Sequence, residues 1–119
     1  MRPIRTLVVD DEQLAREELC FLLGRIDDVE ITGEAADGID ALRAAGELKP
    51  DLIFLDVQMP GLTGFEVARR LVEADLPIEI VFVTAFDQYA IEAFSVNAVD
   101  YLLKPVDAER LEQTMARVR

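Results

Sequence analysis

Five polar residues stand where short apolar runs of the sequence end, and their types fit one kind of chemistry. Asp10 and Asp11 follow the first run, Asp56 the third, Thr84 the fourth and Lys104 the fifth. Carboxylates that lie close together repel one another and raise each other's pKa unless a cation neutralises them. Such oxygen ligands suit Mg²⁺, beside which a carboxylate can become an aspartyl phosphate. An ammonium and a hydroxyl can hold phosphoryl oxygens, so the set predicts phosphoryl transfer.

These residues can meet only if the runs that precede them form one sheet. Apolar runs and helical periodicity predict strands at residues 4–9, 29–36, 52–55, 79–83 and 99–103, and helices at 12–23, 38–45, 65–74, 88–94 and 108–118. Pro and Gly predict a loop at 59–64, and Gly24 is expected to end the first helix. Five strands that alternate with five helices predict a parallel sheet covered on both faces.

The order of the strands follows from how apolar each of them is. Parallel strands buried on both faces read as apolar runs without alternation, as the first, third and fourth do. The second strand alternates and is expected at an edge. The sequence therefore predicts an α/β, flavodoxin-like (βα)5 fold with strand order 2-1-3-4-5. Sites of such sheets lie beyond the carboxyl ends of the strands where the order switches, which is where these polar residues should converge.

Composition and charge exclude several classes of protein. The chain has 119 residues, of which 51% are hydrophobic and 30% charged, which predicts one globular domain over residues 1–119. Twelve Lys and Arg against 24 Asp and Glu give a net charge of −12, which argues against direct binding of nucleic acid or an anionic membrane. The chain contains no His, which excludes His-dependent triads and metal sites.

The cysteine content and the lack of long apolar stretches favour a cytoplasmic location. Cys20 is the single cysteine, so it cannot form an internal disulfide, and it is expected to be a small core residue in a reducing compartment. No apolar run approaches the roughly 20 residues of a membrane span, and the first residues lack the apolar stretch of a signal peptide.

Each of these signals has an ordinary structural explanation when it is taken alone. An Asp after a strand is usually a helix N-cap, and Asp10 or Asp11 could cap the first helix. A Lys-Pro pair after a strand is usually a turn, and a single Thr-Ala pair predicts nothing. Their joint occurrence at the ends of strands that should meet is what favours a functional site.

The motifs resemble those of response-regulator receiver domains over essentially the full chain. Residues 8–12 (VVDDE) resemble the family's acidic pair, and residues 52–61 (LIFLDVQMPG) its phosphoacceptor strand and loop. Residues 83–85 (VTA) and 100–105 (DYLLKP) resemble its switch Thr, its switch aromatic residue and its Lys before a cis-proline. No core position of these motifs departs from the family's pattern.

The resemblance implies a role for each residue of the acidic cluster. Asp56 would be the phosphoacceptor, taking its phosphoryl group from a phosphohistidine on a sensor histidine kinase. Mg²⁺ would be bound directly by Asp11, Asp56 and the backbone carbonyl of Gln58, and by Asp10 mostly through water. The chain would take part in its own phosphorylation and dephosphorylation without being an enzyme in the usual sense.

The resemblance also implies how the phosphoryl group would be held and sensed. Thr84, the backbone of Ala85 and Lys104 would bind its oxygens. Tyr101 would swing inward when Thr84 moves toward the phosphoryl group, which makes a two-position switch. Pro105 would follow a cis peptide bond.

Two further positions would set the lifetime of the phosphoryl group. Gln58 and Phe86 stand two residues beyond Asp56 and Thr84, where the family's residues influence attack by water. A bulky apolar Phe86 cannot orient a water molecule, so slow self-dephosphorylation is expected.

Residues 84–105 resemble the corresponding segment of receivers that are joined to LytTR-type DNA-binding domains. The resemblance implies that the chain is the receiver of a longer transcription regulator, whose effector domain would lie beyond Arg119. A natural stand-alone receiver is the alternative.

The segment around the expected fourth helix is unusually apolar and aromatic. At least one or two of its large side chains should lie at the surface, because a short helix packs only one face inward: Phe86, Tyr89, Ile91, Phe94 and Val96. This suggests a phosphorylation-dependent homodimer through helix four, strand five and helix five. Candidates for the polar rim of that face are Asp100, Glu109, Arg110 and Arg117.

Three other functions fit part of the pattern. A phosphatase of the haloacid dehalogenase type needs a second Asp where this chain has Gln58. A dinucleotide-binding module needs a G-x-G-x-x-G motif after the first strand, where residues 10–12 are acidic. A pseudo-receiver would be an interaction module that is never phosphorylated. Its usual mark is the loss of an acidic residue or of the Lys, and neither is lost here.

Overall fold

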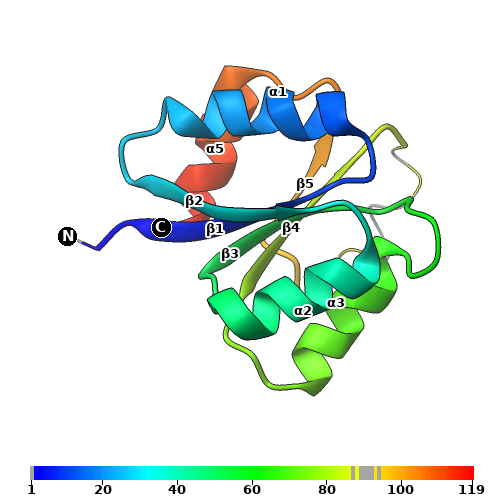
Figure 1. Cartoon of the computed structure of the whole chain (residues 1–119). Helices are drawn as coiled ribbons and strands as arrows, with labels where there is room; N and C mark the ends of the chain where they lie inside the picture. The colour runs from blue at the N-terminus through cyan, green and yellow to red at the C-terminus, as the bar shows by residue number, and fades with distance from the viewer. Residues whose placement is uncertain (1, 87, 89–92, 94) are drawn as a thin grey trace.

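The polar residues are carried by a five-stranded parallel sheet in a computed structural model that describes residues 2–86, 88, 93 and 95–119 (Figure 1). The strands are β1 (Ile4–Val9), β2 (Val29–Ala35), β3 (Leu52–Asp56), β4 (Glu79–Thr84) and β5 (Asp100–Leu103). The helices described are α1 (Gln13–Gly24), α2 (Gly38–Leu48), α3 (Gly64–Glu73) and α5 (Ala108–Val118). The helix expected at 88–94 lies largely outside the described residues. The strand order is β2-β1-β3-β4-β5, which confirms the predicted fold.

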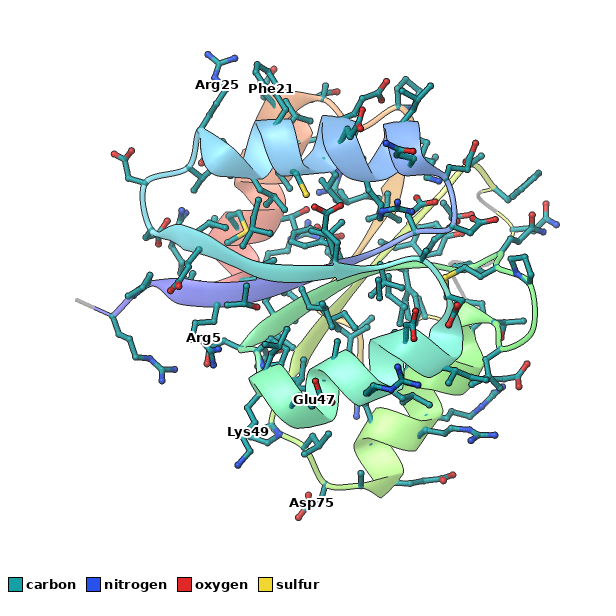
Figure 2. The ribbon with its side chains drawn as sticks, in the orientation of Figure 1. Arg5, Phe21, Arg25, Glu47, Lys49 and Asp75 are labelled. Atoms are coloured by element: carbon teal, nitrogen blue, oxygen red, sulfur yellow. The ribbon has the colours of Figure 1, made fainter. Side chains whose placement is uncertain are left out.

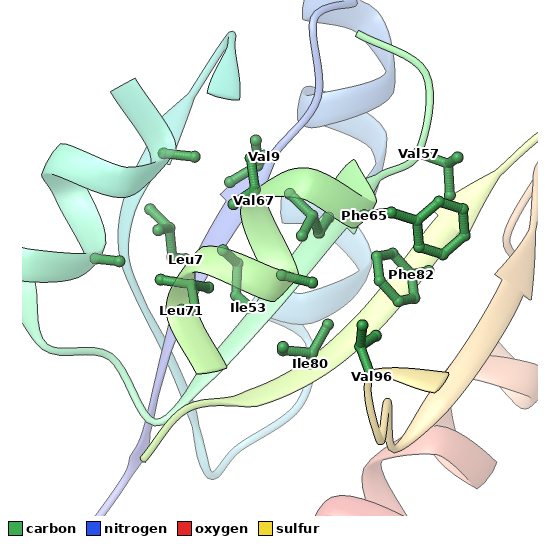
Figure 3. Close-up of a cluster of buried hydrophobic side chains, with 14 of the residues drawn as sticks. Leu7, Val9, Ile53, Val57, Phe65, Val67, Leu71, Ile80, Phe82 and Val96 are labelled. Carbon is green, nitrogen blue, oxygen red and sulfur yellow. The ribbon is translucent and has the colours of Figure 1, made fainter. Parts of the chain in front are cut away.

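Helices cover both faces of the sheet, with α1 and α5 on one side and α2 and α3 on the other (Figure 1). Every residue of β3 is buried, whereas β2 is partly exposed along most of its length, as expected for a central and an edge strand. Two apolar clusters fill the layers. The larger lies between the sheet and α2 and α3, where the rings of Phe65 and Phe82 pack with centroids 4.7 Å apart (Figure 3).

Helix α2 runs to Leu48 and not to the expected end at residue 45, because a tertiary contact supports its last turn. Leu48 packs against the larger cluster, and a methyl of Leu48 lies 2.8 Å from where Gly33 would carry a Cβ atom. Gly46 therefore sits inside the helix, and Lys49 ends it in the left-handed region with φ of 48°. Gly24 likewise belongs to α1, which ends one residue later than expected.

Side chains cap three of the helices and so fix where they begin. Thr63 and Glu66 form a reciprocal capping box at the start of α3. Asp37 and Asp107 cap α2 and α5 through their carboxylates, whereas Glu12, which precedes α1, makes no such bond. None of the helices described is long and apolar enough to span a bilayer.

Candidate metal and phosphoryl site

Three carboxylates meet at the carboxyl ends of β1 and β3, two strands that lie side by side. Asp10 and Asp11 follow β1, and Asp56 is the last residue of β3. One oxygen from each carboxylate lies within 4.8 Å of the other two. Asp10 and Asp56 are buried, and Asp11 is exposed. The site therefore occupies the predicted place, where the strand order switches.

The ammonium of Lys104 lies against this cluster from the loop that follows β5. Its Nζ atom is 2.7 Å from Asp10, 3.4 Å from Glu12 and 3.6 Å from Asp56. Burial lowers the pKa of Lys104, but its hydrogen bond to Asp10 and the charges of the carboxylates outweigh burial, so the net shift is upward. Lys104 thus stays a cation beside Asp56. The peptide bond between Lys104 and Pro105 is cis.

Asp56 is poorly suited to carry its negative charge without a cation. Burial raises the pKa of its carboxyl, and the charge of Asp10 raises it further, to about 7. The ammonium of Lys104 and the backbone N–H of Gln58 oppose the shift without cancelling it. A divalent cation would supply the missing positive charge.

This pKa predicts how the stability of the metal-free protein depends on pH. The folded protein binds the Asp56 proton more tightly than the unfolded chain, so protonation below about pH 7 stabilises the fold. We expect the free energy of unfolding in EDTA to fall by about 2 kcal/mol from about pH 5 to about pH 7.5. Urea unfolding measured across this range tests the prediction. Asp56→Asn should flatten the profile, and the same slope in that variant would contradict it.

The donor set fits Mg²⁺, because carboxylate oxygens on short loops are the hard ligands that this ion takes. The oxygens of Asp10 are already engaged, one accepting from the backbone N–H of Glu12 at 2.9 Å and the other facing Lys104. That arrangement suits contact with a cation through water. Asp11 and Asp56 are the candidates for direct contact. The hydrogen bond to Glu12 also shows that Asp10 orders the turn into α1 while it contributes to the site.

Thr84 and Tyr101 are joined through the backbone of Phe86. The buried hydroxyl of Thr84 accepts from the N–H of Phe86 at 3.3 Å, and the Tyr101 hydroxyl donates to the carbonyl of the same residue. The backbone N–H of Lys104 donates to the Thr84 carbonyl at 2.8 Å. A shift of Thr84 would thus act on both Phe86 and Lys104. Ala85 lies between Thr84 and Phe86 and is exposed.

A family model for the response regulator receiver domain matches residues 6–116. The chain belongs to the response-regulator receiver family. The transcriptional regulatory protein BtsR of Salmonella typhi is 52% identical over 116 residues, which are 98% of this receiver and 48% of that protein. An uncharacterized response regulatory protein of Vibrio vulnificus is 52% identical over 115 residues, which are 97% of the receiver and 47% of that protein. The chain thus spans about half the length of these relatives.

Solved receiver structures share the fold over nearly the whole chain. The response regulatory domain of mrkE from Klebsiella pneumoniae has a TM-score of 0.88 at 36% identity, covering 96% of this receiver and 93% of that chain. The receiver domain of the putative response regulator NarL from Mycobacterium tuberculosis has a TM-score of 0.91 at 30% identity, covering 98% and 95%.

Two features of this receiver were not predicted from the sequence. The first is Gly64, the first residue of α3, whose N–H donates to the Val57 carbonyl at 2.9 Å. A Cβ atom on Gly64 would lie 2.2 Å from the backbone oxygen of Asp56, which is closer than any side chain can be. The loop after β3 is therefore folded back tightly against the residue that ends the strand.

The second is an ion cluster around Asp100 at the start of β5. Both carboxylate oxygens of Asp100 pair with the guanidinium of Arg110 at 2.8 Å, and Arg117 and Thr114 add contacts at 2.8 and 2.7 Å. The suggestion that Asp100 lies on the rim of an interface is therefore wrong, because the residue is buried and bound within its own chain. Glu109 of α5 is exposed.

Within the described residues, the apolar segment before β5 contains both exposed and buried large side chains. Phe86 is 42% exposed and Val96 is buried, so at least one large side chain does lie at the surface. Tyr89, Ile91 and Phe94 lie outside the described residues.

Cys20 of α1 is half-buried. Burial, followed by the nearby charge of Glu34, raises the pKa of its thiol to about 11, which makes the thiol a poor nucleophile.

Proposed function

We propose that this receiver is a Mg²⁺-dependent phosphoacceptor switch that takes a phosphoryl group onto Asp56 from a sensor histidine kinase in the cytoplasm. The observation that carries the proposal is the meeting of Asp10, Asp11 and Asp56 with the Lys104 ammonium at 3.6 Å from Asp56. Negative charge brought by a phosphoryl group needs this positive group and a cation beside it.

Each group has a defined task in the transfer. A carboxylate oxygen of Asp56 attacks phosphorus, and the leaving group departs with the electron pair of the bond that breaks. The ammonium of Lys104 pairs with a phosphoryl oxygen, and its three N–H donors allow it to keep its contact with Asp10. The hydroxyl of Thr84 and the backbone of Ala85 hold further oxygens. Asp11, Asp56, the backbone carbonyl of Gln58 and, through water, Asp10 would hold Mg²⁺, which would neutralise charge on the carboxylates and the phosphoryl group.

A small phosphodonor tests the proposal without the kinase. Incubation with acetyl phosphate and Mg²⁺ should raise the intact mass by one phosphoryl group, and EDTA should prevent the rise. If the mass does not change at saturating Mg²⁺, the proposed phosphoacceptor role is wrong and the pseudo-receiver alternative is favoured.

A protein donor also needs a surface on which to dock, and α1 offers one. Leu14 and Phe21 are 72% and 66% exposed, and their spacing of seven residues puts them on one face of the helix. Leu14 also lines a cavity of about 310 Å³ that reaches Lys104. We infer that the kinase domain that presents the phosphohistidine covers this face.

The signal would leave through Thr84, Phe86 and Tyr101 toward an output domain. The hydrogen bonds that join the Thr84 hydroxyl to the Phe86 N–H and the Tyr101 hydroxyl to the Phe86 carbonyl support this route. The relatives about twice as long as this chain include proteins named as transcriptional regulators, which supports a DNA-binding output. We propose that this output domain is of the LytTR type, on the resemblance of residues 84–105.

Phosphorylation is expected to promote self-association through the face formed by β5, α5 and the helix expected at residues 88–94. Phe86 and Leu103 are 42% and 47% exposed there, and Arg110 and Arg117 both pair with Asp100, although the Arg117 side chain is 57% exposed. Sedimentation with Mg²⁺ and beryllofluoride should show a dimer that the untreated protein lacks, and Leu103→Asp should abolish it. A monomer in both conditions at hundreds of micromolar would exclude this face.

Phe86 is expected to slow the loss of the phosphoryl group by water. Its backbone is bonded to Thr84, and its apolar ring cannot orient an attacking water molecule. Phe86→Ala should shorten the lifetime about threefold or more from a wild-type value of minutes to hours. Decay of the phosphorylated mass gives the lifetime, and Val72→Ala, a smaller truncation of an exposed apolar side chain on α3, should leave it unchanged. A wild-type half-life of seconds would refute shielding by Phe86.

A further inference from the structure

Glu12 contacts the phosphoryl site but has no part in the function proposed above. Its carboxylate lies 3.4 Å from the Lys104 ammonium, next to the shorter contact of 2.7 Å between Lys104 and Asp10. The Glu12 side chain is 70% exposed and makes no capping bond to α1, although the residue precedes that helix. Glu12 is therefore a charge at the mouth of the site that the local fold does not require.

The balance of charge at the site depends on Glu12. Three carboxylates, those of Asp10, Glu12 and Asp56, lie within 3.6 Å of the Lys104 ammonium, and Asp11 is the fourth carboxylate of the cluster. One divalent cation would leave one negative charge in excess. Glu12 is the carboxylate of the four that neither the metal nor the phosphoryl group would use, so the excess charge falls on it.

The surroundings of Glu12 do not remove this charge. Arg16, one turn further along α1, pairs with Glu34 at 3.4 Å and donates to the Asp10 carbonyl at 2.7 Å. The cavity of about 310 Å³ between α1 and the loop after β5 is lined by Asp10, Glu12 and Glu18 together with apolar side chains, and Lys104 is the one cation among the described residues that line it. An anion that approaches Asp56 along α1 therefore meets negative charge first.

We propose that Glu12 is a specificity-determining residue that disfavours small phosphodonors in proportion to their negative charge. The inference rests on the proposed phosphorylation of Asp56. With acetyl phosphate, the new bond joins an Asp56 oxygen to phosphorus, and acetate leaves with the electron pair of the broken phosphorus–oxygen bond. With phosphoramidate, the phosphorus–nitrogen bond breaks and ammonia leaves with the protons that its nitrogen already carries. Near neutral pH the first donor is a dianion and the second a monoanion, so Glu12 should repel the first more strongly.

The experiment compares initial rates of phosphorylation with both donors at saturating Mg²⁺ and low ionic strength. Glu12→Gln should raise the rate with acetyl phosphate about threefold and that with phosphoramidate less than about twofold. Both increases should vanish in about 0.5 M KCl, where the Debye length falls to a few ångström. Glu12→Asp, which keeps the charge, should resemble the wild type.

A matched control separates the local charge from the net charge of the protein. Glu47 is exposed on α2, on the side of the sheet away from α1 (Figure 2). Glu47→Gln removes the same formal charge and should change neither rate.

The outcomes distinguish this inference from the function on which it rests. A wild-type protein that neither donor phosphorylates overturns both. Wild-type phosphorylation at Asp56 with equal changes for the two donors, or with changes that survive high salt, overturns the role of Glu12 alone, because Glu12 would then act through the position of Lys104. Unchanged or slower rates in Glu12→Gln overturn it as well.

Discussion

The Asp56→Asn variant is expected to acquire no phosphoryl group from acetyl phosphate and Mg²⁺ while its metal-free form becomes more stable than the wild type. The amide oxygen is too weak a nucleophile to replace the carboxylate, so phosphorylation should fall below detection. The variant also removes a charge that burial and Asp10 make costly at neutral pH. We expect it to gain about 2 kcal/mol in the free energy of unfolding at pH 7.5 in EDTA.

Two measurements on the same samples check this prediction: intact mass after incubation with the donor, and urea unfolding. Asp75→Asn is the matched control, because Asp75 is exposed at the end of α3 in a left-handed conformation that Asn also adopts (Figure 2). That variant should gain one phosphoryl group and unfold within about 0.5 kcal/mol of the wild type. The same modified mass in Asp56→Asn would place the phosphoacceptor elsewhere. Loss of both phosphorylation and stability would mean that misfolding explains the defect.

The Asp100→Ala variant is expected to lose about 3 kcal/mol of stability at neutral pH. Burial alone would raise the pKa of Asp100, but hydrogen bonds from Arg110, Thr114 and the N–H of Tyr101 outweigh it and bring the pKa to about 2. Truncation leaves the Arg110 guanidinium half-buried without its bidentate partner and takes one acceptor from the buried Thr114 hydroxyl. Urea unfolding at pH 7 measures the loss.

A comparison within the cluster and a change of pH test the cause. Arg117→Ala removes the more exposed partner and should cost less than about 1 kcal/mol. A carboxyl with a lowered pKa stabilises the fold above its unfolded pKa, so the contribution of Asp100 should be lost as pH falls from about 4 to about 2. The difference between wild type and Asp100→Ala should shrink over that range. Equal losses from Asp100→Ala and Arg117→Ala would contradict the buried-carboxylate explanation.

The sequence predicts the central strands and the meeting of the site residues for the same reason. Parallel strands buried on both faces must be apolar throughout, so polar residues mark where they end, and Asp10, Asp56 and Thr84 stand at those ends. Because the carboxyl ends of such strands share one edge of the sheet, proximity follows from the order of the strands alone.

Contacts that depend on how a helix is rotated against the sheet could not be predicted in this way. Asp100 and Arg110 both look like surface charges in the sequence, and only the packing of α5 on β5 makes one of them buried and bidentate. The ion pair between Glu12 and Lys104 joins residues that are 92 positions apart in the sequence. Their side chains meet because both residues follow strands, β1 and β5, whose carboxyl ends lie at the same edge of the sheet. The extra turn of α2 depends on the space that Gly33, which has no side chain, leaves for Leu48. The helix propensities of residues 46–48 do not reveal this contact.

Gly64 bears on how a mutational map of this protein should be interpreted. Any side chain there would push against the backbone of Asp56, so substitution at Gly64 should move the proposed phosphoacceptor even though Gly64 gives no atom to the chemistry. In a saturation screen scored by signalling, the position would look as intolerant as a reactive residue. Stability distinguishes the two kinds of position: Gly64→Ala should lower the free energy of unfolding of the metal-free protein, whereas Asp56→Asn should raise it.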